Sequence, residues 1–278
     1  MSLDEQGARP AVPAEVDTSR PNIARIYDAG LGGKDNFEVD RQVMRAILEV
    51  APDAGVAVRD NREWLIRVTR FLAENAGIRQ FVDLGSGLPT AENTHEIAQR
   101  IAPDSTVVYV DNDPVVEAHS RALLEENEQT HFVRGDLTDP GELLSESVLG
   151  RILDLSEPIA LYQIGILHHF ADIDRLRAIM RTYVDALAPG SYVAISHFHN
   201  PGGEYDEIAK RVGKIMLDSG MGGGYFRSRE EIASLFAGVE LVEPGLTLAP
   251  DWWPDGPRTA PLVVPQRMFL VGLARKNG

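Results

Sequence analysis

Short apolar runs alternate with amphipathic stretches through the middle of this chain. Runs of three to five residues lie at 81–83, 106–110, 131–134, 159–163 and 192–195. Between them, apolar residues recur at helical spacing, as in Leu176, Ile179, Met180, Tyr183 and Val184. Buried strands that alternate with amphipathic helices predict a parallel sheet covered by helices on both faces.

Two further runs, at 239–242 and 268–274, predict closing strands near the end of the chain. Together the runs predict a doubly wound α/β fold with a mostly parallel, seven-stranded sheet. The predicted boundaries are a flexible tail at 1–20, a helical lid or extension at 21–77, and the α/β part at 78–278. An insertion around 200–228 interrupts this part, and its glycine-rich turn at 220–224 is suited to a segment that covers a substrate.

The N-terminal extension combines helices with an unusual loop. A short helix leads into Gly30–Asn36, which carries Lys34 and Asp35, and a longer helix spans about Arg59 to Glu74. The loop is either a lid that faces a ligand or a helix C-cap with a solvated charge pair. Arg59, Asn61 and Arg62 belong either to the surface or to a site.

The composition narrows the function classes. The chain has 278 residues, no cysteine and a formal net charge of -15. Without cysteine there are no disulfides and no thiolate metal sites, which fits a reducing cytoplasm, and we predict no metal site. The negative charge disfavours a nucleic-acid partner, and no apolar run is long enough to span a membrane. We expect a cytoplasmic protein that acts on a small molecule.

A glycine turn follows the first apolar run. The sequence Phe81-Val-Asp-Leu-Gly-Ser-Gly87 reads as a strand, a turn and then a helix from about Thr90 to Ile101. Gly85 and Gly87 adopt backbone angles that other residues avoid, and they let a ligand approach the backbone. The N–H groups that open the next helix would favour an anionic group of that ligand. A tight connection without any ligand is the alternative.

Aspartates close the first three strands. In a doubly wound sheet, ligands bind beyond the carboxyl ends of the strands, where Asp83, Asp111 and Asp136 fall. Asp111 is placed to accept hydrogen bonds from a ribose diol, and Asp136 with Leu137 is placed beside an adenine ring. A nicotinamide dinucleotide site is the obvious competitor, but the turn lacks the third glycine of the G-x-G-x-x-G pattern.

These segments resemble the class I S-adenosylmethionine-dependent methyltransferases, which have a Rossmann-like fold. The resemblance covers about residues 60 to 278 and rests on Phe81–Gly87, Val110–Pro114, Gly135–Leu137, Ile166–His169 and Leu187–Gly190. The fourth strand departs from amino-methylating relatives, because it ends in Leu-Tyr-Gln-Ile-Gly rather than in an acidic or amide-containing catalytic motif. DNA-type N-methylation is therefore not expected.

The N-terminal extension carries a narrower resemblance. It is similar to an actinobacterial family of S-adenosyl methyltransferases described as a domain of unknown function, through Tyr27–Phe37, Asn61-Arg62, Ser196-His197 and Trp253-Pro254. The implied cofactor is S-adenosylmethionine, and the implied product is S-adenosylhomocysteine.

The resemblance implies a role for each matching residue. The turn of Gly85, Ser86 and Gly87 would pass the methionine part of the cofactor, with Asp83 near its amino group. Asp111 would hold the ribose hydroxyls. Asn112 would flank the adenine, and Asp136 and Leu137 would line the adenine pocket. Gln163 would lie below the sulfonium.

Few side chains are candidates for a general base. His168 and His169 follow the fourth strand, and His197 and His199 follow the fifth. We prefer His197 as the catalytic residue, with His168 and, from the N-terminal helix, Tyr27 as further candidates. A histidine at a strand end is also commonly a structural hydrogen-bonding residue.

The function that these features favour is methyl transfer from S-adenosylmethionine to a small-molecule acceptor. One alternative is a protein that binds or senses S-adenosylmethionine without catalysis. A weaker alternative is an NAD(P)-dependent oxidoreductase. The sequence does not determine the acceptor or the oligomeric state.

Overall fold

The fold is seen in a computed structural model that describes residues 17–90, 92–124 and 127–278. The tail predicted at 1–20 lies largely outside the described residues. No helix in the described ranges is long and apolar enough to cross a membrane.

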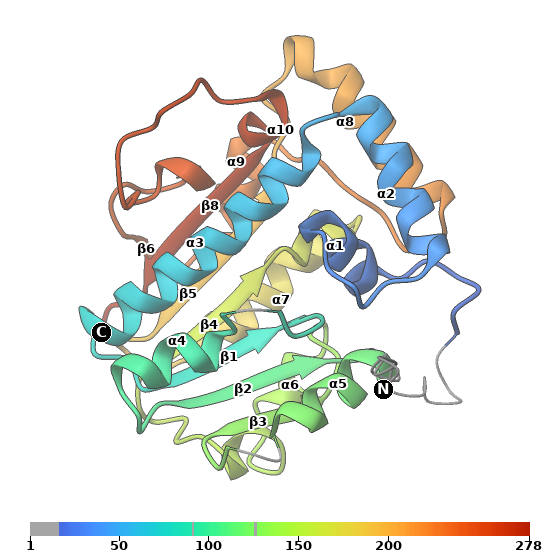
Figure 1. Ribbon diagram of the computed structural model, residues 1–278. Helices are drawn as coiled ribbons and strands as arrows, with labels where there is room; N and C mark the ends of the chain where they lie inside the picture. Colours follow the sequence, from blue (N-terminus) through green and yellow to red (C-terminus); the bar gives the residue numbers. More distant parts are fainter. Residues whose placement is uncertain (1–16, 91, 125–126) are drawn as a thin grey trace, which may run out of the picture.

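A single twisted sheet forms the centre of the molecule (Figure 1). Its strands are β1 (Gln80–Leu84), β2 (Thr106–Asp111), β3 (Thr130–Arg134), β4 (Ile159–Ile164), β5 (Tyr192–Phe198), β6 (Glu240–Leu241), β7 (Thr247–Leu248) and β8 (Phe269–Arg275). Seven of them follow the order β3-β2-β1-β4-β5-β8-β6, and the two-residue β7 pairs with β8. The pairs from β3 to β5 are parallel, and those of β8 are antiparallel. The predicted Rossmann-like fold is confirmed.

Helices cover both faces of the sheet. They are α1 (Ile23–Leu31), α2 (Glu38–Val50), α3 (Ala54–Glu74), α4 (Thr94–Ile101), α5 (Pro114–Leu124), α6 (Pro140–Leu143), α7 (Ile173–Ala186), α8 (Asp206–Asp218), α9 (Arg229–Ala233) and α10 (Val264–Arg267). One core contains Trp64, Val68 and Leu72 of α3 packed against the sheet. The other contains Met180 and Tyr183 of α7. These are the apolar faces that the helical spacing predicts.

Two helix starts differ from the sequence prediction. The helix expected from about Arg59 begins already at Ala54. Asn61 therefore lies beyond its first turn. The helix expected from Thr90 begins at Thr94, because Asn93 and Glu96 form a capping box there. The preceding residues therefore remain irregular next to the glycine turn.

The strand order reverses beside β1. The chain runs outward from β1 to β2 and β3, then returns to form β4 and β5 on the other side. The connecting segments diverge at this reversal, which leaves a crevice at the carboxyl ends of β1 and β4.

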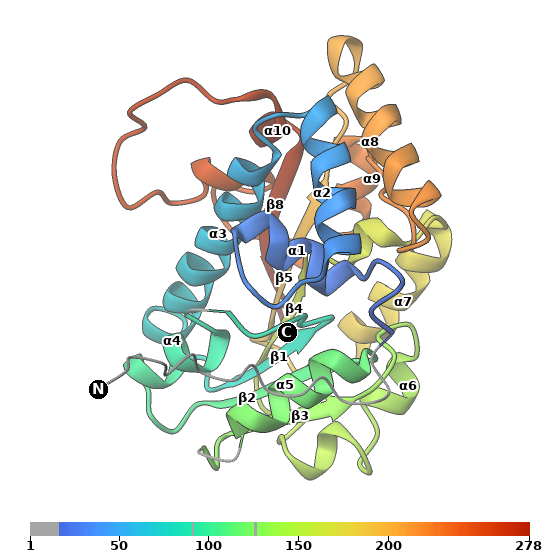
Figure 2. The same ribbon diagram turned by 45° about the vertical axis from the view of Figure 1, so that its right-hand side comes forward.

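The N-terminal helices and α8 pack together above these strand ends. Ile26 of α1 and Val43 and Ile47 of α2 share a small core with Val212 and Met216 of α8. Figure 2 shows α2 beside α8, with α1 next to α2. The segments predicted as extension and insertion thus form one cover.

A buried ion pair holds the first residues of α1 and α2 in this cover together. Arg25 Nε donates to Asp40 Oδ2 over 2.8 Å, and both side chains are almost inaccessible to solvent. The same carboxylate accepts hydrogen bonds from the backbone N–H groups of Asn22 and Phe37. Asp40 therefore joins the starts of α1 and α2.

Removing the charge of Asp40 should destabilise the protein strongly. Asp40→Asn leaves the Arg25 guanidinium buried without its counter-charge, and we expect a loss of about 3 kcal/mol in the free energy of unfolding. Urea denaturation measures this loss. The matched control is Asp35→Asn at an exposed position, which should change stability by less than about 0.5 kcal/mol. Equal effects of the two substitutions would contradict the assignment.

Candidate active site

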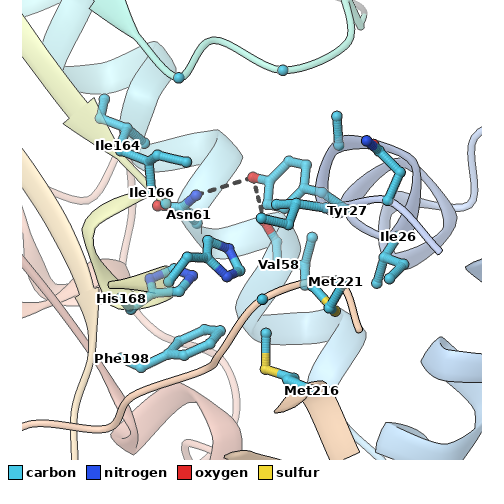
Figure 3. A pocket seen from close by; sticks show the side chains of 18 of the residues that line it. Ile26, Tyr27, Val58, Asn61, Ile164, Ile166, His168, Phe198, Met216 and Met221 are labelled. Atoms are coloured by element: carbon cyan, nitrogen blue, oxygen red, sulfur yellow. Dashed lines mark hydrogen bonds between the residues drawn. The ribbon is translucent and has the colours of Figure 1, made fainter. Parts of the chain in front are cut away.

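A cavity of about 700 Å³ lies between the strand ends and the helical cover. Its floor comes from the segments that follow β1 to β5, and its cover comes from α1, α2, α3, α8 and the turn at 220–226. Figure 3 shows side chains from these separate elements around one space. Two parts with different chemistry share this cavity.

The polar part contains most of the residues predicted to bind the cofactor. Among the residues that line it are Asp83, Gly85, Ser86, Gly87, Asp111, Asn112, Asp136 and Leu137. They come from the ends of three neighbouring parallel strands. The structure therefore brings these predicted residues together.

Backbone hydrogen bonds orient Asp111. Its Oδ2 accepts from Gly87 N and its Oδ1 from Asp113 N, each over 3.0 Å. Each carboxylate oxygen keeps a lone pair for a further donor. Asn22 at the start of α1 donates to the Asp113 carboxylate, which brings the N-terminal cover to the end of β2.

Asp83 is a buried carboxyl at the end of β1. Its side chain is 5% exposed, and Thr94 Oγ1 donates to Oδ2 over 3.0 Å. Burial raises the pKa of Asp83 to about 6, the Thr94 hydrogen bond opposes this rise, and the nearby Arg62 opposes it further. A cationic group in the cavity would compensate for this buried charge.

The glycine turn shapes the cavity, and the N–H groups of Gly85, Ser86 and Gly87 already have acceptors within the protein. Gly85 and Gly87 have φ angles of +68° and +66°, and a Cβ on Gly85 would lie 2.5 Å from Ile166 Cγ1. The N–H groups of Gly85 and Ser86 both donate to Val110 O. The neighbouring strand thus uses these two N–H groups, whereas the anionic group is expected at the N–H groups that open the next helix, α4. The Ser86 hydroxyl is buried without a partner.

The second part of the cavity is largely apolar. It is lined by side chains from α1, α2, α8, β5 and the segments after them, including Ile26, Met44, Ile47, Phe198, Val212, Met216, Met221, Phe226, Met268 and Phe269. The glycine-rich turn contributes Gly220 and Gly222, so it does lie over the cavity as predicted.

Tyr27 lines this part but is poorly suited to act as a base. Its hydroxyl donates to Val58 O over 3.4 Å and accepts from Asn61 Nδ2 over 3.0 Å (Figure 3). Burial raises its pKa above the ordinary value of a tyrosine. Asn61 Oδ1 is buried beside it without a hydrogen-bond partner.

His168 is a predicted base that reaches the cavity. It is 4% exposed, and its Nδ1 has no hydrogen-bond partner. Burial is the main cause that holds its pKa well below 6.5, so the ring is neutral at neutral pH. The neighbouring His169 also lines the cavity, but its Nδ1 hydrogen-bonds Gly223 O.

His197, the preferred base, is not in the cavity lining. The side chain is fully buried, its Nδ1 hydrogen-bonds Phe198 O over 2.7 Å, and its Nε2 accepts from the Arg227 guanidinium over 2.8 Å. Burial lowers its pKa to about 3. Both ring nitrogens of His197 are therefore engaged, and this preferred candidate does not meet the cavity, whereas His168 does. His199 is likewise outside the lining and hydrogen-bonds Arg227 O.

Gln163 and the Gly30–Asn36 loop also lie away from the cavity lining. Gln163 is fully buried, and its two amide atoms have no partners. Side chains alternate along a strand, and the lining begins at the next residue, Ile164. Gly32 caps α1 in the left-handed conformation, and the buried Asp28 carboxylate of α1 accepts from Asp35 N and Asn36 Nδ2 of the loop, which supports the C-cap interpretation.

Within the part of the chain that the structure describes, no group of three or more histidine, cysteine or acidic side chains is arranged to hold an ion.

A family model described as S-adenosyl methyltransferase matches residues 9–277. The chain belongs to the S-adenosyl methyltransferase family. It is an S-adenosylmethionine-dependent methyltransferase, and S-adenosylmethionine is its cofactor, as predicted. The orphaned Ser86 hydroxyl, the open glycine turn and the buried Asp83 fit a cofactor that carries an ammonium group and a sugar.

Solved structures support the family assignment. A candidate methyltransferase of Thermobifida fusca YX is 40% identical with a TM-score of 0.91, and the match covers 97% of this chain and 100% of that one. A DUF574 family protein of Streptomyces avermitilis MA-4680 is 38% identical with a TM-score of 0.87, covering 94% and 99%.

An O-methyltransferase family protein of Burkholderia thailandensis, at 15% identity and a TM-score of 0.50, covers 81% and 61% and shares the fold alone. No curated protein matches the methyltransferase.

Sequence reasoning passed over several residues of the methyltransferase cavity. Phe226 and the methionines at 44, 216, 221 and 268 were not selected, since each fits an ordinary helix face or turn locally. Asn61 was noted without a role.

Substituting Asp83 should raise the stability of the free methyltransferase at alkaline pH. Its pKa rises on folding from 3.8 to about 6. Its contribution to stability is therefore full below about pH 4 and is lost as the pH rises through about 6. Asp83→Asn removes the buried charge, so we expect a gain of about 2 kcal/mol at about pH 8 and little change at about pH 4.

Urea denaturation at both pH values checks this expectation. Asp136→Asn, at an exposed position of the same sheet edge, is the control and should change stability at neither pH. A loss of stability in Asp83→Asn at the higher pH would contradict this expectation. It would show that groups in the free protein already stabilise the Asp83 carboxylate.

Proposed function

We propose that the methyltransferase transfers the methyl group of S-adenosylmethionine to a small, largely apolar molecule. The observation that carries this proposal is the division of one cavity into a polar part at the strand ends and an apolar part under α1, α2 and α8. Its volume of about 700 Å³ lies within the range of about 300 to 1,000 Å³ that small-molecule sites have. The net charge of -15 disfavours a nucleic-acid acceptor.

Residues of the polar part would hold the cofactor. Asp83, ionised above about pH 6, would face its amino group. Asp111, oriented by two backbone N–H groups, would accept from the ribose hydroxyls. The remaining contacts, to the adenine and the methionine part, are assigned to Asn112, Asp136, Leu137 and the turn Gly85, Ser86 and Gly87. The bound cofactor supplies an electrophilic methyl group on a sulfonium.

The end of β4 joins the two parts of the cavity. Ile166 approaches Gly85 of the turn, and His168 lies two residues further along the same segment. A neutral imidazole at this boundary can take the proton that a hydroxyl or amine releases when it is methylated. Because burial keeps His168 neutral, it remains a proton acceptor through the neutral and alkaline range. The apolar cover excludes water from the transfer.

Labelled cofactor tests the acceptor class. The protein is incubated with methyl-labelled S-adenosylmethionine and with separate small-molecule, protein and nucleic-acid fractions of a cell extract. We expect label to enter only extractable small molecules, because the acceptor part lies beneath helices. Label in the protein or nucleic-acid fraction, with none in the small molecules, would overturn the proposal. Calorimetric titration with S-adenosylmethionine confirms that each preparation binds the cofactor.

Substituting His168 tests the base. We expect His168→Gln to lower the rate of S-adenosylhomocysteine formation with the active small-molecule fraction by about 100-fold. The affinity for S-adenosylmethionine should stay within about twofold, because the ring is assigned to the acceptor. The wild-type rate should be independent of pH between about 7 and 9, where His168 is neutral. His119→Gln, outside the cavity lining on α5, is the control. A rate within threefold of wild type in His168→Gln would remove His168 from the mechanism.

A further inference from the structure

Three aromatic rings form a stack at the acceptor part of the cavity. The centroid of the Phe198 ring lies 3.6 Å from the centroid of the His168 ring, at an interplanar angle of 16°. It lies 4.8 Å from the centroid of the Phe226 ring, at an interplanar angle of 14°. Two rings cannot occupy the same face of Phe198 at these separations, so they cover opposite faces. All three residues line the cavity, and Phe198 therefore presents its ring edge to it.

Ring edges select a particular partner. The edge of an aromatic ring carries partial positive charge and its face partial negative charge, so an edge attracts the face of another aromatic ring. A saturated molecule of the same size gains only its apolar contact. This wall of the cavity favours a flat aromatic ligand.

Methionines form much of the remaining wall. The described residues include five methionines, and four of them, Met44, Met216, Met221 and Met268, line the cavity. In Figure 3, Met216 and Met221 lie around the same space as Phe198 and His168. Thioether sulfur makes favourable contacts with aromatic rings, and the flexible side chain adapts to rings of different outline. The methionines thus favour the same ligand class as the ring stack.

An orphaned acceptor atom adds a polar requirement. Asn61 is 2% exposed, its Nδ2 is held by the Tyr27 hydroxyl, and its Oδ1 has no partner. A buried carbonyl oxygen without a partner is costly unless a ligand donates to it. Asn61 lies beside Gly165 at the end of β4, near the segment that carries His168. A ligand here should therefore carry an O–H or N–H group.

We propose that the methyl acceptor is a flat aromatic molecule with a hydroxyl or amino group, and that the site tolerates several ring outlines. This inference rests on the proposed function. The acceptor oxygen or nitrogen forms the new bond to the methyl carbon as the carbon–sulfur bond breaks, with its electron pair left on sulfur. The acceptor group donates to Asn61 Oδ1 when it binds, and its proton passes to His168 as the new bond forms. The products are the O- or N-methylated aromatic molecule and S-adenosylhomocysteine.

Matched probes test the ring preference without requiring turnover. Calorimetry measures the binding of 2-naphthol, decahydro-2-naphthol and 2-methoxynaphthalene to protein saturated with S-adenosylhomocysteine. We expect 2-naphthol to bind roughly tenfold more tightly than either of the others, because the second lacks the aromatic faces and the third lacks the donor. Equal affinities of 2-naphthol and its saturated counterpart would overturn the proposal.

Two variants tie the preference to the stack. Phe198→Leu and Phe226→Leu keep an apolar side chain but remove ring edges, and each should reduce the 2-naphthol preference over the saturated probe to about threefold or less. Phe226 is only partly buried, so its variant serves if Phe198→Leu fails to fold. Phe71→Leu, in a ring cluster outside the cavity, is the control and should keep the full preference. An unchanged preference in a folded stack variant would contradict the assignment.

The two proposals fail in different ways. Selective binding of 2-naphthol by a protein that methylates no small molecule would support the aromatic site and contradict the proposed function. Methylation confined to saturated acceptors would support the proposed function and overturn the aromatic site.

Discussion

The parallel sheet imposes the constraint on which the rest of this molecule depends. Parallel strands deliver their carboxyl ends, with their polar residues, to one edge that the sheet itself cannot cover. Here the cover comes from two segments far apart in the sequence, since α1 and α2 share a small core with α8. The cavity is the space left between this cover and the strand ends. Its polar floor and apolar ceiling therefore follow from the two different structures that enclose it.

The same enclosure shifts the titratable groups toward neutrality. Burial raises the pKa of Asp83 to about 6 and holds that of His168 well below 6.5, so each change disfavours a charge in the free protein. For Asp83 this is a cost that a bound ammonium group would offset. For His168 it keeps the ring able to accept a proton. One physical cause thus disfavours the charged forms of an acid and of a base, and such shifts commonly occur at functional sites.

Prediction from the sequence succeeded where structure is local. The glycine turn, the strand ends at Asp83 and Asp111, and the helix faces follow from spacing and turn chemistry within a few residues. It failed where the facing of a side chain depends on distant contacts. His197 and Gln163 occur in strands, and whether such a side chain meets the cavity depends on which sheet face neighbouring elements leave open.

By itself, the sequence determined the fold class and the sheet edge where the polar residues gather, because the alternation of apolar runs and turn residues encodes these locally. The cofactor followed from the resemblance of these segments to the S-adenosylmethionine-dependent methyltransferases. Only the tertiary structure decided that His168, rather than His197, meets the cavity, and that Asn61 and the methionines join it. These residues come from elements far apart in the chain. Their meeting depends on how the helical cover packs on the sheet, which no short pattern of residues specifies.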